Sequence, residues 1–185
     1  MITFYHLFVA HLLADFVFQP QALVDWKQKS WKGLAVHVLI HWVLSILILS
    51  PYLPNFKLLL LLFGVTLSHF MVDMIKIRWQ KESKRYVSLF FLDQAVHVFI
   101  LLLATSAIRI FKPALQNIPP VNYFDPQLFA AIILGLLFTY FVEILSFQFV
   151  RQHNEHAQVS INWIEMTQRL VLFAILWIAF GAFGR

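Results

Sequence analysis

The chain has 185 residues, of which 61% are hydrophobic and only 12% charged, and its mean hydropathy is +0.75. Because soluble domains carry about 25% charged residues, so short and apolar a chain cannot cover itself with polar surface in water. The net charge of +5 predicts no nucleic-acid partner, because the basic residues stand in short segments between apolar runs, and the absence of cysteine excludes thiolate metal sites and disulfides.

Apolar runs as long as the roughly 20 residues that cross a bilayer follow one another along the chain. The expected spans are 2–18, 33–50, 57–77, 87–110, 127–150 and 160–182. The fold class is therefore all-α: one integral membrane domain over residues 1–185, a bundle of about six transmembrane helices. The first run lacks a basic segment before it, so we expect a retained span and no cleaved signal peptide. The polar segment 21–32 is expected to lie in the membrane interface.

Basic residues are distributed unequally between the two sides of this predicted bundle. One side has Lys27, Lys29, Lys32, Lys76, Arg78, Lys81, Lys84, Arg85 and Arg151. The other side has only Lys57, Arg109, Lys112 and Arg185. Since cytoplasmic connections carry the excess of lysine and arginine, we expect both termini outside the cytoplasm.

Ionisable side chains occur inside the first four spans as pairs with i,i+4 spacing. The pairs are His11–Asp15, His37–His41, His69–Asp73 and Asp93–His97. This spacing places both members of a pair on one helical face, and on the expected boundaries all eight residues lie in the cytoplasmic half of their helices. Ionisable groups inside a membrane are costly and usually mark a functional site. We therefore expect the four helices to surround one polar pocket.

Neutral imidazole and carboxylate are ligands for divalent metals. The candidate ligands are His11, Asp15, His37, His41, His69, Asp73 and His97. Zinc is favoured, with iron or manganese as alternatives, and the donors suffice for one or two ions. Asp93 and Glu165 are the candidate catalytic bases. Side chains expected to support the site from behind are Gln19, Gln94, Lys76, Glu143 and Arg169.

A purely structural role is the alternative for each of these residues. Histidine and aspartate in membrane helices hydrogen-bond between helices and fix their packing. Lys76 and Arg78 are expected to extend toward lipid phosphates, and Glu165 and Arg169 form an i,i+4 ion pair that needs no functional site. Four pairs at one depth favour the metal or catalytic pocket over packing alone.

The motifs HLLADFVFQ (11–19), HVLIH (37–41), HFMVDMIK (69–76) and DQAVH (93–97) resemble the bacterial membrane-protein family called domain of unknown function 3307. The resemblance implies a multi-pass protein of the bacterial cytoplasmic (inner) membrane, with both termini periplasmic on the charge argument. It implies no activity. A weaker likeness, to small membrane-bound metal-dependent hydrolases, favours hydrolysis by analogy alone.

Two functions of different classes remain open. The first is a metal-dependent hydrolase whose partners are membrane lipids and whose substrate is a lipid, a lipid-linked phosphate or a membrane-embedded peptide. The alternative is a cation or proton transporter that uses the same cluster. The outer halves of the spans are almost entirely apolar, which favours a pocket open to one side. A non-catalytic partner subunit is a third interpretation.

Overall fold

The computed structural model describes residues 2–83, 85–154 and 163–183, and every regular element in these ranges is a helix. The elements are α1 (Ile2–Leu12), η1 (Leu13–Val17), α2 (Gln21–Lys29), α3 (Trp31–Ile48), η2 (Ser50–Tyr52), α4 (Phe56–Ser83), α5 (Tyr86–Phe111), α6 (Pro126–Leu136), η3 (Leu137–Phe141), α7 (Val142–His153) and α8 (Trp163–Phe183). The predicted all-α class is confirmed.

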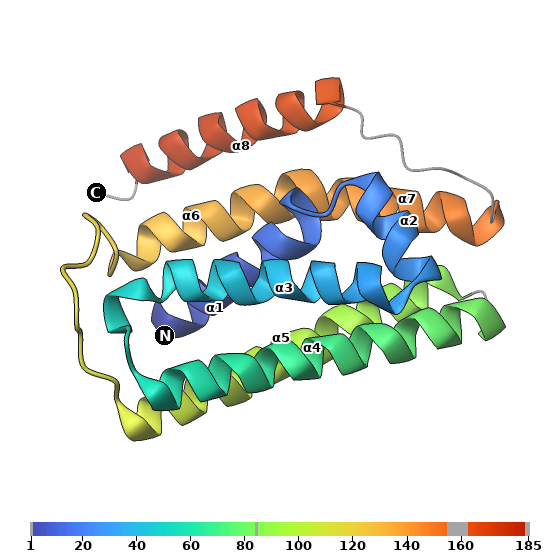
Figure 1. The fold of residues 1–185 in the computed structure, drawn as a ribbon. Coiled ribbons are helices and arrows are strands. Elements are labelled where there is room, and N and C mark those ends of the chain that lie inside the picture. Colours follow the sequence, from blue (N-terminus) through green and yellow to red (C-terminus); the bar gives the residue numbers. More distant parts are fainter. Residues whose placement is uncertain (1, 84, 155–162, 184–185) are drawn as a thin grey trace.

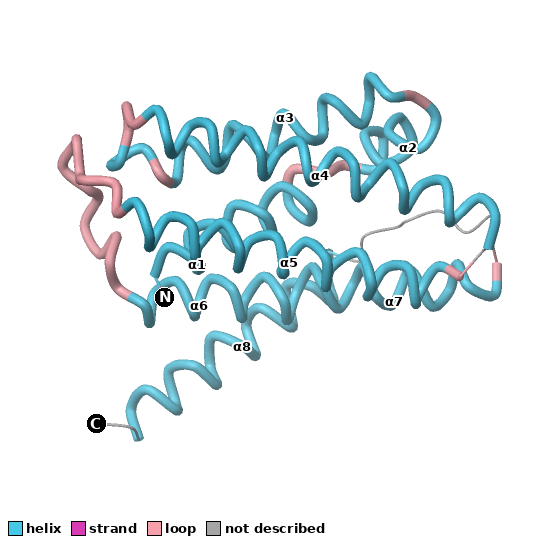
Figure 2. Tube along the Cα trace, turned by 90° about the horizontal axis from the view of Figure 1, so that it is seen from below, coloured by secondary structure: helices cyan, strands magenta, loops and turns pink. Residues whose placement is uncertain are grey.

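The long helices run side by side along one axis, as Figures 1 and 2 show from two directions. α1 lies among α3, α5 and α6, while α4 packs on α3 and α5. α8 packs on η3, at the middle of the helix formed by α6 and α7. Elements α1, α3, α4 and α5, which carry the four polar pairs, are therefore neighbours.

Four helices in the described ranges are long and apolar enough to cross a membrane, namely α3, α4, α5 and the continuous helix Pro126–His153. The first two helical segments count as a fifth span if the bend between them is accepted within one span. The expected sixth span, 160–182, corresponds to α8, of which residues 160–162 lie outside the described ranges. The membrane character is thus supported, and the number six stays a prediction.

The first span departs from the single straight helix expected over 2–18. Its last turn, Leu13–Val17, is a π-helix, and the chain then bends by 91° into α2. A second π-turn, η3, interrupts the fifth span and contacts η1. π-turns are rare and occur often at functional sites, so their contact marks this level of the bundle.

The bend brings α2 back against α3, and Gly33 makes this close approach feasible. A Cβ atom on Gly33 would lie 2.6 Å from the backbone carbon of Trp26, closer than real contacts allow. The segment expected to lie in the interface therefore packs on the bundle and directs its polar side chains inward.

We expect Gly33→Ala to lower the unfolding free energy by about 1–3 kcal/mol, because the methyl group must push α2 away from α3. Gly64 is the matched control, since a Cβ there meets nothing within 4 Å. Gly64→Ala should be neutral or stabilising by up to about 1 kcal/mol through helix propensity. Thermal unfolding of the purified protein in detergent measures both. Equal melting temperatures for the two variants would contradict the close approach of α2.

Two apolar clusters fill the bundle away from the polar pairs. One joins α1, the end of α3, α4 and α5 through Leu7, Leu49, Leu58, Leu62, Leu101, Ala104 and Ile108. The other joins α1, η1 and α6 through Val9, Leu12, Phe16 and Ile133. The first cluster separates the polar pairs from the end of the bundle at η2.

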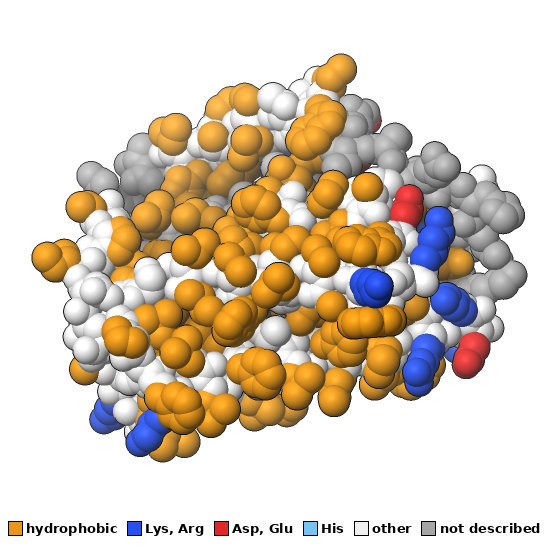
Figure 3. Space-filling view, viewed as in Figure 1, with side chains coloured by type: hydrophobic (Ala, Val, Ile, Leu, Met, Phe, Trp, Pro, Cys, Tyr) orange, Lys and Arg blue, Asp and Glu red, His pale blue; other side chains and the backbone are white. Residues whose placement is uncertain are grey.

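Hydrophobic side chains cover the long flank of the molecule, and lysine and arginine gather mainly at one end, as Figure 3 shows. We call the end formed by α2, the α4–α5 connection and the end of α7 the basic end. A hydrophobic flank between two polar ends is the surface that a bilayer requires. Lys84 and Arg185, which entered the charge comparison, lie outside the described residues.

The charge asymmetry predicts that the basic end faces the cytoplasm. Reporter fusions at Lys81 and at the C-terminal Arg185 should give cytoplasmic and periplasmic signals respectively. The reversed pair of signals would overturn this orientation, and a fusion at the exposed Lys57 serves as a second periplasmic marker.

Candidate metal centre

The four polar pairs converge at one level of the bundle. Seven of their eight members are buried, and the eighth, Asp15, keeps only 11% of its side chain exposed. Three adjacent imidazole pairs, His41–His69, His69–His97 and His11–His97, have ring centroids 3.7, 4.1 and 5.1 Å apart. The i,i+4 faces predicted from the sequence therefore meet.

One set of four donor atoms has the spacing of a metal site. The Oδ1 atom of Asp15 lies 2.8 Å from His41 Nε2, 3.3 Å from His37 Nε2 and 3.7 Å from His69 Nε2. The nitrogens of His37 and His69 are 3.2 Å apart. Tetrahedral zinc with bonds of about 2.0–2.1 Å requires donor separations of about 3.3 Å. The observed separations scatter around that value, so Asp15, His37, His41 and His69 fit one tetrahedral ion.

Asp73 approaches the same donors from α4. Its Oδ2 atom lies 3.5 Å from His37 Nε2 and 3.9 Å from His69 Nε2. Lys27 of α2 donates a hydrogen bond of 3.1 Å to this oxygen. A buried carboxylate so paired remains ionised next to the imidazoles. Lys27 is thus a site residue that sequence reasoning counted only as a basic loop residue.

Two further histidines lie at the edge of this set. The Nδ1 atom of His97 lies 2.8 Å from the carbonyl oxygen of Asp93 and donates to it, while its Nε2 atom is buried without a hydrogen-bond partner among the described residues. The Nε2 atom of His11 likewise has no hydrogen-bond partner there and lies 3.5 Å from Asp15 Oδ2.

Asp93 lies behind the donors, bound to a lysine. Lys76 donates a hydrogen bond of 2.5 Å to its carboxylate, which is 2% exposed, and Gln94 donates to the same oxygen at 3.2 Å. Gln94 also lies 3.4 Å from Asp15 Oδ2. Lys76 therefore points into the bundle, contrary to the expectation that it extends to lipid phosphates.

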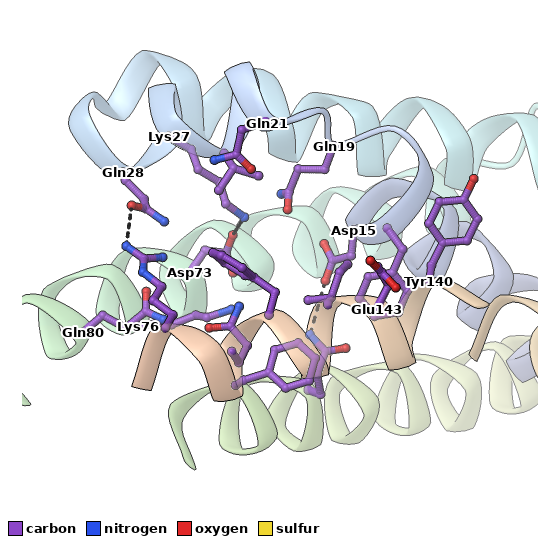
Figure 4. A pocket seen from close by; sticks show the side chains of 18 of the residues that line it. Asp15, Gln19, Gln21, Lys27, Gln28, Asp73, Lys76, Gln80, Tyr140 and Glu143 are labelled. Carbon is purple, nitrogen blue, oxygen red and sulfur yellow. Dashed lines mark hydrogen bonds and ion pairs between the residues drawn. The ribbon is translucent and has the colours of Figure 1, made fainter. Parts of the chain in front are cut away.

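A cavity of about 150 Å³ lies beside the donors on the side of the basic end, and Figure 4 shows the side chains around it. Asp15 and Asp73 belong to both the donor cluster and the cavity wall. The cationic groups on the wall are Lys27, Lys76 and Arg151, and the amides include Gln19, Gln21, Gln28, Gln80, Gln94 and Gln148. The cavity is large enough for a few waters or a small anionic group.

Gln19 and Arg151 show how the wall connects to the donors. The amide nitrogen of Gln19 lies 2.9 Å from His37 Nδ1, which supports the predicted orienting role beside that ring. Arg151 stacks over Tyr86 at 4.6 Å and contacts Gln28 at 3.4 Å, yet its Nε atom is buried without an acceptor among the described residues. Sequence reasoning missed Arg151 because a single arginine in a loop resembles an ordinary topology signal.

Glu143 and Glu165 have different positions, although the sequence made both of them site candidates. Glu143 lies on the cavity wall and pairs with Arg169 at 2.8 Å. Glu165 is 58% exposed, also pairs with Arg169, at 3.0 Å, and is not a wall residue. The structure therefore does not bring Glu165 to the cluster. Of the two residues, Glu143 is the one at the site.

His6, the remaining histidine of α1, lies outside the cluster. Its Nε2 atom donates to the carbonyl of Tyr123 at 2.9 Å, and its ring stacks on the tyrosine ring. It is completely buried, which agrees with a packing role near the end opposite the basic one.

Comparison with known proteins places these motifs in a family. No curated protein and no solved structure matches the chain. The family described as protein of unknown function DUF3307 matches residues 3–124, a range that contains all four polar pairs and the five helices α1 to α5. The chain that builds this buried histidine–aspartate cluster belongs to the DUF3307 family.

Proposed function

We propose that this protein is a metal-dependent hydrolase acting on a membrane lipid that carries a phosphate or similar anionic group. The observation that carries the proposal is the joint position of the donor cluster and the cavity. Donor atoms spaced for a tetrahedral ion share two carboxylates, Asp15 and Asp73, with a polar cavity at the basic end. A divalent ion held there would lower the pKa of bound water to about 7 and polarise the scissile group.

The cavity wall favours an anionic substrate. Lys27 and Lys76 reach it from α2 and α4, and Arg151 offers a buried N–H that has no acceptor among the described residues. A phosphate oxygen is a strong acceptor for arginine and lysine. The apolar part of the wall, with Phe16, Phe90 and Phe147, suits the first carbons of a lipid chain.

Proton transfer needs a carboxylate next to the cavity. Glu143 is on the wall, so it is proposed as the general base, with Arg169 fixing its orientation. Asp93, the base predicted from the sequence, stays a candidate that would act only through Gln94 or Lys76, because its carboxylate lies behind them.

The competing function, cation or proton transport, is less well supported. A transport path must continue to the other end of the bundle, where Leu7, Leu58, Leu62 and Leu101 form an apolar cluster. A charge at mid-bilayer costs on the order of 3 kcal/mol even on the mildest scale. The donors thus face a polar cavity on one side and a hydrophobic barrier on the other.

The two functions are separated by one pair of assays on reconstituted protein. Phospholipid and polyprenyl-phosphate substrates are offered to the metal-loaded protein, and ion flux is followed in liposomes. We expect hydrolysis that is lost in Asp73→Asn and retained in Asp25→Asn, a change at an exposed carboxylate of α2. Saturable flux that needs His69 and Asp73, without hydrolysis, would replace the enzyme with a transporter.

A further inference from the structure

The buried cluster contains more donors than one ion uses. A second set, formed by His69, Asp73 and His97, also has its donor atoms within 4.8 Å of one another. It shares only His69 with the set of Asp15, His37, His41 and His69. Because one ring nitrogen binds one ion, His69 completes either set but not both through the same atom.

His97 has the arrangement of a metal ligand with no counterpart inside the protein. Its Nδ1–H donates to the Asp93 carbonyl at 2.8 Å, which leaves the lone pair on Nε2. That nitrogen is buried, the residue is 3% exposed, and no described group donates to it. Leaving a buried acceptor unsatisfied costs about 1–3 kcal/mol, so the orientation is explained by a ligand that accepts the lone pair.

We propose that a second divalent cation binds at His69, Asp73 and His97, beside the first, and that the protein has a binuclear centre. The proposal rests on the metal site of the proposed function but not on hydrolysis. Each ion then has two imidazoles and one carboxylate, a ligand set that leaves positions open for water or substrate. The first ion keeps Asp15, His37 and His41.

The carboxylates lie between the two sets. Asp15 Oδ1 is 3.7 Å from His69 Nε2, and Asp73 Oδ2 is 3.5 Å from His37 Nε2, so each approaches an imidazole of the other set. The nearest nitrogens of the sets, on His37 and His69, are 3.2 Å apart. These separations suit two ions at the roughly 3.5–4 Å spacing of two-metal hydrolytic sites, with carboxylates between them.

The test counts metal in full-length protein purified without a histidine tag and saturated with Mn²⁺ or Zn²⁺. We expect two ions per chain, and one in His97→Gln. His6→Gln is the matched control, a change at another buried histidine, and should retain two ions. Two ions in His97→Gln would overturn the assignment of His97. One ion in the unchanged protein would overturn the second site alone, whereas none would overturn the metal-dependent function as well.

Electron paramagnetic resonance of the Mn²⁺-loaded, unchanged protein gives a readout that needs no variant. Two ions at the proposed spacing should show an exchange-coupled signal that is absent at one equivalent of Mn²⁺. Two bound ions with only the signal of isolated Mn²⁺ would place the second ion elsewhere and overturn the binuclear centre.

Discussion

Replacing both His37 and His41 with alanine is expected to remove at least one ion per chain while the protein still inserts into the membrane. Both imidazoles contact the same oxygen of Asp15, at 3.3 and 2.8 Å. Zinc binding of about 10–16 kcal/mol shared by four ligands amounts to about 3 kcal/mol per ligand, so losing two weakens binding on the order of 10⁴-fold.

Metal content measured after purification at fixed free metal reports this loss. His153→Ala is the control, because His153 is exposed at the end of α7 and bonds only the carbonyl of Phe149 among the contacts described. An unchanged metal content in the double variant would eliminate His37 and His41 as ligands.

Lys76→Met should be among the most destabilising single substitutions in the chain. It leaves the carboxylate of Asp93, which is 2% exposed, without its cation inside the bundle. Removing one partner of a buried ion pair costs about 3–5 kcal/mol. Lys81→Met, at an exposed lysine of the same helix, should change stability by less than about 0.5 kcal/mol. Thermal unfolding in detergent measures both.

Adding Asp93→Asn to Lys76→Met separates stability from chemistry. Neutralising the stranded carboxylate should recover most of the lost stability, since no uncompensated charge remains. If the double variant is folded, binds metal and still hydrolyses substrate, Asp93 has a structural role. A folded, metal-bound but inactive double variant would support Asp93 as the base and count against Glu143.

The convergence of the polar pairs was predictable because a membrane leaves such residues few alternatives. An ionisable group in a span must face protein, so i,i+4 pairs at matching depth on neighbouring helices meet in the interior. That argument covers His11, His37, His69 and His97, which all lie in the cluster. It needs only depth and helical phase, both of which the sequence contains.

The cavity was not predictable by the same argument. Lys27 stands in a segment whose composition indicates the interface, and only the bend after η1 brings it to Asp73. Neither hydropathy nor i,i+4 spacing carries the direction of a bend. The same applies to Glu143 and Glu165, which both pair with Arg169. Which one faces the cavity depends on how α8 packs on the fifth span.

The π-turn at Leu13–Val17 has a consequence for how this chain tolerates changes in length. Relative to a continuous α-helix it accommodates an additional residue, and one residue corresponds to about 100° around a helix axis. Deleting one residue after Asp15 would redirect everything that follows by about a quarter of a turn. Gln19 and Lys27 would then leave His37 and Asp73 together. The hydropathy of the span would hardly change, so a single-residue deletion would insert normally yet dismantle one wall of the cavity.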